Sequence, residues 1–494
     1  MAEFIIGNMA PLMFGALVMF LLFGYPVAFA LAANGIVFGL IGIELGLLTP
    51  ALFQALPERI FGIMSNDTLL AIPFFTFMGL VLERSGMAED LLDTIGQLFG
   101  PMRGGLAYAV IFVGALLAAT TGVVAASVIS MGLISLPIML RYGYDKRLAC
   151  GIIAASGTLA QIIPPSLVLI IMADQLGKSV GDMYQGAIMP AMILTGLYVG
   201  YVFLLTMIKP KTAPALPPEA RTLHGIKMLT RVITTMVPPL MLIFLVLGTI
   251  FLGIATPTEG GAMGAAGALV LAMGRKRLSF KLLKQAMETT GKLSSFVIFI
   301  LVGSTVFGLI FRAVNGDLWV EHLLTSLPGG QMGFLIVVNI MVFLLAFFLD
   351  FFELSFIIVP LLAPVADKLG IDLVWFGILL AVNMQTSFMH PPFGFALFYL
   401  RSVAPPSIKT TDIYWGAVPF VCIQIVMVAI IIIFPGVVSY GDAAQQAQAQ
   451  MERDGTAPPP IDLDAMMNSA NEEGDKPTDD AAANLLKDLQ ENSK

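Results

Sequence analysis

Apolar stretches long enough to cross a lipid bilayer recur along most of this chain, and they constrain its fold more than any other feature. About 20 consecutive apolar residues span the hydrocarbon layer as an α-helix. Only 12% of the 494 residues are charged, against about 25% in an average soluble domain. So few charges do not cover a water-soluble particle of this size. The sequence therefore predicts an all-α polytopic membrane protein, because helices satisfy their own backbone hydrogen bonds in lipid.

Two kinds of apolar stretch can be distinguished. About ten are uninterrupted and predict spanning helices, with cores at 4–23, 28–48, 67–83, 148–173, 186–208, 232–252, 258–274, 293–311, 373–400 and 413–436. Two others are interrupted near the middle, residues 104–140 by Thr120, Thr121 and Gly122, and residues 332–366 by Asp350 and Glu353. Each predicts two short helices that meet at a polar tip, a re-entrant hairpin. Such broken backbone is tolerated only inside protein or along a wet cavity.

The distribution of basic residues predicts the orientation. With the N-terminus outside, 18 of the 22 Lys and Arg residues before residue 441 fall in inside loops. The outside loops then hold Arg59, Lys178, Arg312 and Lys368. Because basic loops favour the cytoplasmic side, we expect a protein of the bacterial inner membrane with both termini in the periplasm. Residues 441–494 hold 12 acidic and 4 basic residues, and 437–494 are predicted to be an acidic, disordered tail.

Prolines recur at similar intervals in the two halves of the chain. Pro137, Pro164-Pro165 and Pro190 correspond to Pro360, Pro391-Pro392 and Pro419. The charge bias gives the two copies opposite orientations, and an inverted repeat with broken helices is typical of secondary transporters; coincidental spacing is the alternative. The expected organisation begins with scaffold helices in 1–66 and a first repeat in 67–208, which holds hairpin 104–140 and broken helix 148–173. Residues 209–292 are expected to form a linker, scaffold helices and an amphipathic arm. A second repeat in 293–436 holds hairpin 332–366 and broken helix 373–400, and the tail follows in 437–494.

Both double prolines lie inside apolar spans, in SGTLAQIIPPS (156–166) and NMQTSFMHPPFG (383–394). Proline removes backbone donors and breaks a helix, but it suits the first turn of the next one. The restarted helix would point its amides at mid-membrane, where they favour a carboxylate, and unwound carbonyl oxygens would suit Na⁺. The side-chain oxygens beside the breaks belong to Ser156, Thr158, Ser166, Asn383, Gln385, Thr386 and Ser387. The alternative is that these groups bond their own backbone.

Asp350 and Glu353 are the acids of the second hairpin. A carboxylate at bilayer depth costs roughly 2.5–3.5 kcal/mol on insertion scales, so we expect a function: cation or substrate coordination, or proton coupling. A structural pair with a helix end or with Arg312 is the alternative. His390 precedes the second double proline and would titrate or bond the substrate, or be a neutral histidine satisfied by backbone.

Other features favour structural interpretations. Cys150 and Cys422 are expected to be buried, inert thiols, and neither a metal-ligand cluster nor a phosphate loop is apparent, so no cofactor is expected. TPTE (256–259) predicts a helix start, and IPFF (72–75) a kinked helix. Two amphipathic faces are expected to lie on the inner leaflet or to form a connecting arm: Leu91, Leu92, Ile95, Leu98 and Phe99, and Phe280, Leu283 and Met287.

Several blocks resemble the large membrane subunit of tripartite ATP-independent periplasmic (TRAP) transporters, the DctM family. They are LLAIPFF (69–75), RGGLA (103–107), LPIMLRYGYD (136–145), AASGTLAQIIPPS (154–166), TPTE (256–259), FLDFFELSFIIVPLLAPVADKLGID (348–372) and PPFG (391–394). The resemblance implies an elevator transporter with two Na⁺ sites. It also implies a small membrane subunit of the DctQ type and a periplasmic binding protein of the DctP type as partners.

The residue patterns and the resemblance together predict two sets of site residues. Those expected to bind an organic acid are Thr121, Gly122, Ser156, Thr158, Asp350, Glu353, Asn383, Gln385 and His390. Those expected to bind Na⁺ are Thr120, Thr121, Val123, Gly157, Pro165, Ser166, Asp350, Thr386, Ser387, Pro392 and Gly394.

The chain departs from the family pattern at four places. It has Thr-Gly-Val at the first tip where Ser-Gly-Ser is usual, Ser127 in place of an Asp, His390 in place of a Thr, and Phe351-Phe352-Glu353 at the second tip. The bulky, more acidic second tip looks like the subgroup linked to 2-oxo acids and other monocarboxylates rather than to sugar acids.

The sequence therefore predicts a Na⁺-coupled importer of an organic acid anion, a dicarboxylate or a 2-oxo or other monocarboxylate, and not an enzyme. Two rivals remain open. One is a standalone Na⁺- or H⁺-coupled anion symporter of similar architecture. The other is a membrane enzyme with Asp350, Glu353 and His390 as catalytic residues.

Overall fold

All regular structure in residues 2–441, the part that the computed structural model describes, is helical. Among these residues six helices are long and apolar enough to cross a membrane, or up to eight if each of two bent helix pairs is one span. This confirms the all-α membrane class. The count is lower than the expected ten because several expected spans consist of shorter helices that end at internal breaks. Most of the acidic tail predicted for 437–494 lies outside the described residues.

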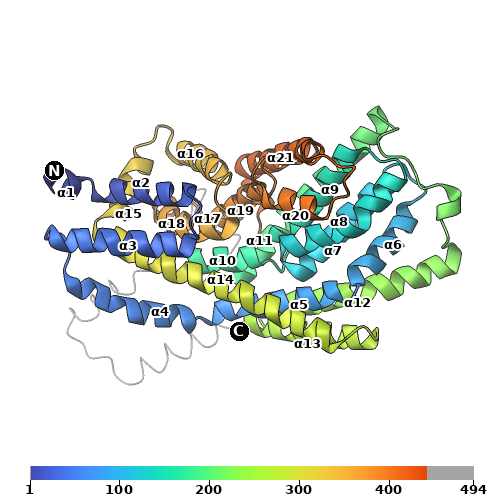
Figure 1. Cartoon of the computed structure of the whole chain (residues 1–494), viewed down its shortest axis with the longest axis horizontal. Coiled ribbons are helices and arrows are strands. Elements are labelled where there is room, and N and C mark those ends of the chain that lie inside the picture. Colours follow the sequence, from blue (N-terminus) through green and yellow to red (C-terminus); the bar gives the residue numbers. More distant parts are fainter. Residues whose placement is uncertain (1, 442–494) are drawn as a thin grey trace, which may run out of the picture. The chain divides into compact units, whose positions relative to one another are not determined.

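The helices follow one another along the chain as Figure 1 shows. They are α1 Ala2–Gly7, α2 Met9–Leu22, α3 Val27–Glu44, α4 Leu56–Met64, α5 Asp67–Arg84, α6 Met87–Phe99, α7 Gly105–Thr121, α8 Val124–Arg141, α9 Lys146–Thr158, α10 Leu167–Leu176, α11 Val180–Ile208, α12 Gly225–Phe251, α13 Pro257–Gly274, α14 Phe280–Ala313, α15 Gly316–Thr325, α16 Gly330–Leu345, α17 Phe351–Ile357, α18 Val359–Lys368, α19 Leu373–Met384, α20 Phe395–Val403 and α21 Thr410–Ile433. Five short 3₁₀ turns, η1 Pro50–Ala55, η2 Leu159–Gln161, η3 Pro218–Ala220, η4 Gln385–Phe388 and η5 Pro435–Val437, complete the described elements.

Residues 104–140, expected as the first hairpin, form α7 and α8. Residues 332–366, expected as the second hairpin, lie in α16, α17 and α18. The first turn is made by Gly122, whose φ of 58° lies in the left-handed region that glycine adopts without strain. The second turn runs from Ala346 to Asp350, and Asp350 caps α17. Both turns are therefore placed by local chemistry, a glycine in one case and a helix cap in the other.

The two expected broken helices have matching construction. Each begins at a capping aspartate, Asp145 for α9 and Asp372 for α19, which accepts a backbone N–H of the first turn. Each then tightens into a 3₁₀ turn, η2 or η4, and unwinds. Pro164-Pro165 and Pro391-Pro392 both lie in the unwound stretch, each pair joined by a cis peptide bond. They do not occupy the first turn of the next helix: α10 follows the cap Ser166 and α20 follows Gly394.

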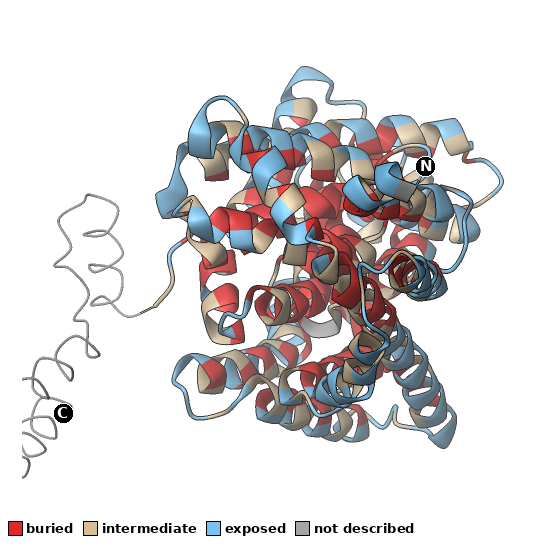
Figure 2. Cartoon of the chain, turned by 90° about the vertical axis from the view of Figure 1, so that its left-hand side faces the viewer, coloured by how far each residue is buried: buried red, intermediate tan, exposed pale blue. Residues whose placement is uncertain are grey.

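Close packing of small residues joins the long helices. Gly35 of α3 and Gly303 of α14 each face the backbone of the other helix, and Gly261 of α13 lies against Phe74 of α5. Small residues let membrane helices approach closely. Thr258 adds a hydrogen bond to the Asp67 carbonyl at 2.6 Å. Buried residues accordingly gather inside the bundle, while exposed ones cover its outer faces (Figure 2).

Residues 280–292, expected as an amphipathic arm, form the first part of α14, a single helix of 34 residues, because nothing between Phe280 and Ala313 stops it. Two other expectations need correction. In α6, Leu91, Leu92 and Ile95 are buried against protein rather than presented to lipid. Cys150 is buried but Cys422 is exposed, since it lies on the outward face of α21.

Gly151 should be intolerant of any side chain. A Cβ there would lie 2.1 Å from the carbonyl oxygen of Gly416, where α9 meets α21. We expect Gly151→Ala to destabilise the protein by about 1–3 kcal/mol through overpacking, seen as a lower Tm in detergent. Gly248→Ala on α12 is the matched control, because its Cβ meets no atom within 4 Å. Equal Tm values for the two variants would contradict this packing.

Candidate functional site

A cavity of about 310 Å³ lies where the two hairpin tips meet the restarts of the broken helices. The first hairpin contributes Gly122 and Val123, and the second contributes Asp350. Its other walls are Val124, Ala125, Gln161, Leu167, Val168, Phe351, Phe352, Phe388, Phe395 and Tyr399, with Leu293 and Phe296 of α14. Segments more than 200 residues apart in the chain thus enclose one space, which we call the inner cavity.

The breaks in the two helices are joined directly. The Gln385 amide donates to the Thr158 hydroxyl at 3.2 Å, and both residues are fully buried. Around this bond four side-chain oxygens are buried without a hydrogen-bond partner among the described residues: Ser156 Oγ, Gln161 Oε1, Gln385 Oε1 and Ser387 Oγ. Orphaned buried polar atoms are uncommon and point to a bound water or ion. Oxygen-rich surroundings suit a hard cation.

The first hairpin tip rests on the restart of α10. A Cβ on Gly122 would lie 3.5 Å from the Leu167 nitrogen and 3.6 Å from the Pro165 carbonyl oxygen. Backbone groups of Gly122, Val123 and Pro165 therefore lie near one another at the inner cavity. The side chains of Thr120 and Thr121, expected at the cation site, lie outside the described part of the chain.

Asp350 and Glu353 form a capping box at the second tip. The Glu353 N–H donates to Asp350 Oδ1 at 2.9 Å, and the Asp350 N–H donates to Glu353 Oε2 at 2.9 Å. Neither acid forms an ion pair among the described residues, Arg312 included. Both acids therefore bond to the N-terminal end of α17, as the helix-end alternative describes. Asp350 also lines the inner cavity, whereas Glu353 does not.

The hydroxyl groups of several expected ligands donate to nearby backbone carbonyls of their own segment. Ser166 Oγ donates to the Gln161 carbonyl at 2.5 Å, Thr158 Oγ1 to that of Ala155 at 2.8 Å, and Thr386 Oγ1 to that of Asn383 at 2.6 Å. Their remaining lone pairs are still available to a cation.

Other expected residues lie around the inner cavity rather than in it. Gly157 packs against Val128 of the first hairpin. The Pro392 carbonyl accepts from the Tyr414 hydroxyl at 3.2 Å, and Gly394 caps α20. These three residues shape the two breaks without lining the space between them.

His390 lies in an aromatic cage and not in the inner cavity. Its ring centroid is 4.3 Å from that of Phe343 and 4.2 Å from that of Phe347, both on the second hairpin. The ring is buried, and neither nitrogen has a well-formed hydrogen bond among the described residues. In this geometry the His390 ring packs against aromatic side chains and does not contact a substrate in the inner cavity.

Asn383 connects the second broken helix to the second hairpin. Its amide donates to the carbonyl and to the side-chain oxygen of Asn339, at 2.8 and 2.9 Å.

Asn339 and Gln161 are site residues that the sequence patterns did not single out. Both are polar residues within apolar runs, which is the signal that would have found them. Leu293 and Phe296 gave no signal, because apolar residues are ordinary in a spanning helix.

A cavity between two hairpins and two broken helices, in which Gln161, Asp350 and Tyr399 are the polar residues among apolar walls, defines a transporter of the broken-helix class in an all-helical membrane protein. The chain belongs to the family of the DctM component of tripartite ATP-independent periplasmic transporters, whose family model matches residues 14–437. A transporter rather than an enzyme follows from this membership.

Curated relatives agree with that assignment. The C4-dicarboxylate TRAP transporter large permease protein DctM of Pseudomonas aeruginosa is 28% identical, over 79% of this chain and 90% of its own. The isethionate TRAP transporter permease protein DctMQ of Oleidesulfovibrio alaskensis is 27% identical, over 81% of this chain and 61% of its own. In fold, the chain resembles the YdaH transporter of Alcanivorax borkumensis, with a TM-score of 0.56 at 15% identity over 80% of this chain and 91% of that one.

Proposed function

We propose that this protein imports an organic acid anion together with Na⁺ across the bacterial inner membrane, as the large subunit of a three-component system. The carrying observation is the set of orphaned oxygens around the Gln385–Thr158 bond, next to a cavity shared by both hairpins. Its partners would be a small membrane subunit and a periplasmic binding protein.

The inner cavity suits a carboxylate held by backbone rather than by a base. No Lys or Arg lines it among the described residues. Leu167 at its wall opens α10, and the amides of a helix N-terminus favour an anion. Asp350 lies on the same space, and two adjacent carboxylates repel each other. A cation between Asp350 and the substrate would remove that repulsion, which makes joint binding of anion and Na⁺ favourable.

The walls favour a small acid with an apolar body. Phe351, Phe352, Phe388, Phe395 and Tyr399 surround the inner cavity. A polyhydroxylated sugar acid would leave hydroxyls unpaired against these rings. The substrate class we propose is therefore a 2-oxo acid or another monocarboxylate, ahead of a C4-dicarboxylate.

Na⁺ would be held by oxygens of the two breaks. The candidates are the orphaned Ser156 and Ser387 hydroxyls, the Gln385 amide oxygen, and backbone carbonyls near Gly122 and Pro165. Na⁺ is a substrate in this proposal, bound and released in each cycle.

We expect uptake of labelled pyruvate or succinate into proteoliposomes holding all three components to require an inward Na⁺ gradient. Gln385→Leu should raise the Na⁺ concentration for half-maximal uptake by roughly tenfold, because an amide oxygen is lost and the Thr158 hydroxyl loses its donor. Asn34→Leu is the matched control, because Asn34 is a buried amide on α3 that donates to the Met13 carbonyl at 3.1 Å and does not line the inner cavity.

Three results would argue against this function. Uptake that ignores the Na⁺ gradient would refute the coupling. Full uptake by this chain alone would favour a standalone symporter. Consumption of the acid without uptake would favour an enzyme.

A further inference from the structure

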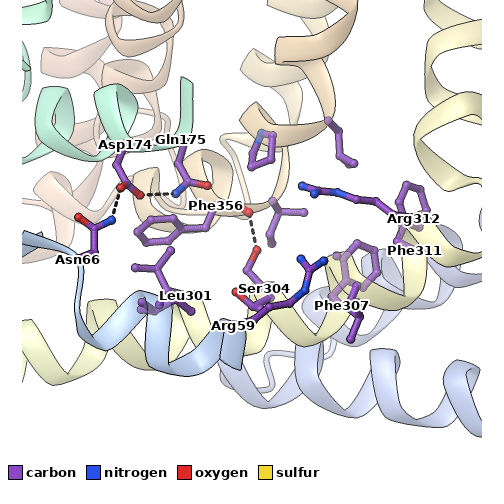
Figure 3. Close-up of a pocket in the computed structure, with 18 of the residues that line it drawn as sticks. Arg59, Asn66, Asp174, Gln175, Leu301, Ser304, Phe307, Phe311, Arg312 and Phe356 are labelled. Atoms are coloured by element: carbon purple, nitrogen blue, oxygen red, sulfur yellow. Dashed lines mark hydrogen bonds between the residues drawn. The ribbon is translucent and has the colours of Figure 1, made fainter. Parts of the chain in front are cut away.

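A second cavity, of about 340 Å³, lies between α4, α14 and the ends of α10 and α18 (Figure 3). It is lined by two basic residues, Arg59 of α4 and Arg312 of α14. Its other polar walls include Asn66, Asp174 and Thr305. We call this space the outer cavity, because Arg59 and Arg312 belong to the loops and helix ends that the charge distribution assigns to the outside.

Both guanidinium groups of the outer cavity are available to a ligand. Arg59 and Arg312 are exposed, and neither forms an ion pair with a described residue. Figure 3 shows the two side chains extending toward the same space from different helices. The acid that lines the cavity, Asp174, is already engaged: it accepts from the Asn66 amide at 2.6 Å and from the Gln175 amide at 2.9 Å.

The outer cavity and the inner one lie along the same two elements. On α14 the inner cavity contacts Leu293 and Phe296, while the outer one extends from Leu301 to Arg312. At 1.5 Å per residue their centres lie roughly 18 Å apart along the helix. The second hairpin also walls both, with Phe351 and Phe352 on the inner cavity and Phe356 to Leu361 on the outer.

We propose that the outer cavity receives the organic acid anion, with Arg59 and Arg312 binding its carboxylate on the outer side of the inner cavity. This inference rests on the proposed function and its orientation. Guanidinium groups match a carboxylate with two parallel hydrogen bonds. Two such charges in a recess with apolar walls also raise the local anion concentration. No Lys or Arg lines the inner cavity among the described residues. The arginines of the outer cavity would therefore attract the anion.

The test measures charge preference directly, with the assembled three-component complex in right-side-out vesicles. Thr305→Cys places a thiol on the outer cavity in a Cys422→Ser background, since Cys150 is buried. An anionic and a cationic methanethiosulfonate are added outside, and the ratio of their modification rates is measured. We expect Arg59→Gln with Arg312→Gln to lower the anionic-to-cationic ratio by about tenfold. Pyruvate or succinate should slow modification only while the arginines are present.

Matched variants separate charge from shape. Arg59→Lys with Arg312→Lys keeps both charges and should keep most of the ratio. Lys178→Gln removes an outside charge that does not line the cavity and should leave the ratio unchanged. Ser326→Cys, an exposed site beyond α15, controls for the intrinsic reactivity of the two reagents. In uptake, the double Gln variant should raise KM about tenfold with little change in kcat.

The outcomes can be told apart. A ratio that does not change in the double Gln variant, with outside labelling intact, overturns the reception site and leaves the proposed function standing. The reception site is also overturned if the double Gln variant loses affinity for the binding protein while the rate ratio stays unchanged and the acid gives no protection. That result would mean that the two arginines contact an acidic protein surface. Labelling of Thr305→Cys only from the inside overturns both the inference and the proposed orientation.

Discussion

Asp350→Asn is expected to abolish uptake, by at least about 100-fold, while insertion and folding are retained. Asparagine caps a helix as well as aspartate does, so the N-cap of α17 and its bond from the Glu353 N–H persist. What is lost is the negative charge on the inner cavity, which we propose draws Na⁺ to the substrate. The measurement is Na⁺-driven uptake in proteoliposomes, together with Tm in detergent.

The control for Asp350→Asn is the same substitution at another helix start. Asp145 caps α9 by accepting the Leu148 N–H at 3.0 Å, and it does not line the inner cavity. Asp145→Asn should keep most of its uptake. If Asp350→Asn transports normally, Asp350 is a helix cap alone, and the proposed cation site is refuted.

Much of the helix layout could be predicted from the sequence, because it depends on local chemistry. Glycine allows the turn at Gly122, and proline leaves no donor in the unwound stretches at Pro164-Pro165 and Pro391-Pro392. The breaks therefore coincide with the residues that cause them. Only the restart of each helix differs, since the caps Ser166 and Gly394 follow the prolines.

The roles of single side chains could not be predicted in the same way, because they depend on which elements meet. The spacing of Asp350 and Glu353 fits both a coordination site and a capping box, and only the turn before α17 places Glu353 away from the inner cavity. His390 adjoins a break in sequence, but the second hairpin encloses its ring. The outer cavity was likewise not predicted, since Arg59 and Arg312 are 253 residues apart and first meet in the fold.

Asn383→Ala is expected to reduce uptake by roughly 100-fold, through misplacement of the second hairpin rather than loss of a ligand. Asn383 is buried and does not line the inner cavity. Its amide supplies both hydrogen bonds to Asn339 of α16. Removing it leaves the buried Asn339 Oδ1 without that donor, and such a loss costs about 1–3 kcal/mol. The tip that carries Asp350 would then no longer be held against α19.

A double-mutant cycle decides between the two roles of Asn383. If it positions the hairpin, Asn339→Ala should lose uptake to a similar extent, and the double variant should fall little further, because contacting residues are not additive. Asn34→Ala is the matched control, a buried asparagine of α3 that donates to the Met13 carbonyl at 3.1 Å and should transport normally once folded. Fully additive losses at Asn383 and Asn339 would instead mean that Asn383 acts on the substrate or on Na⁺ directly.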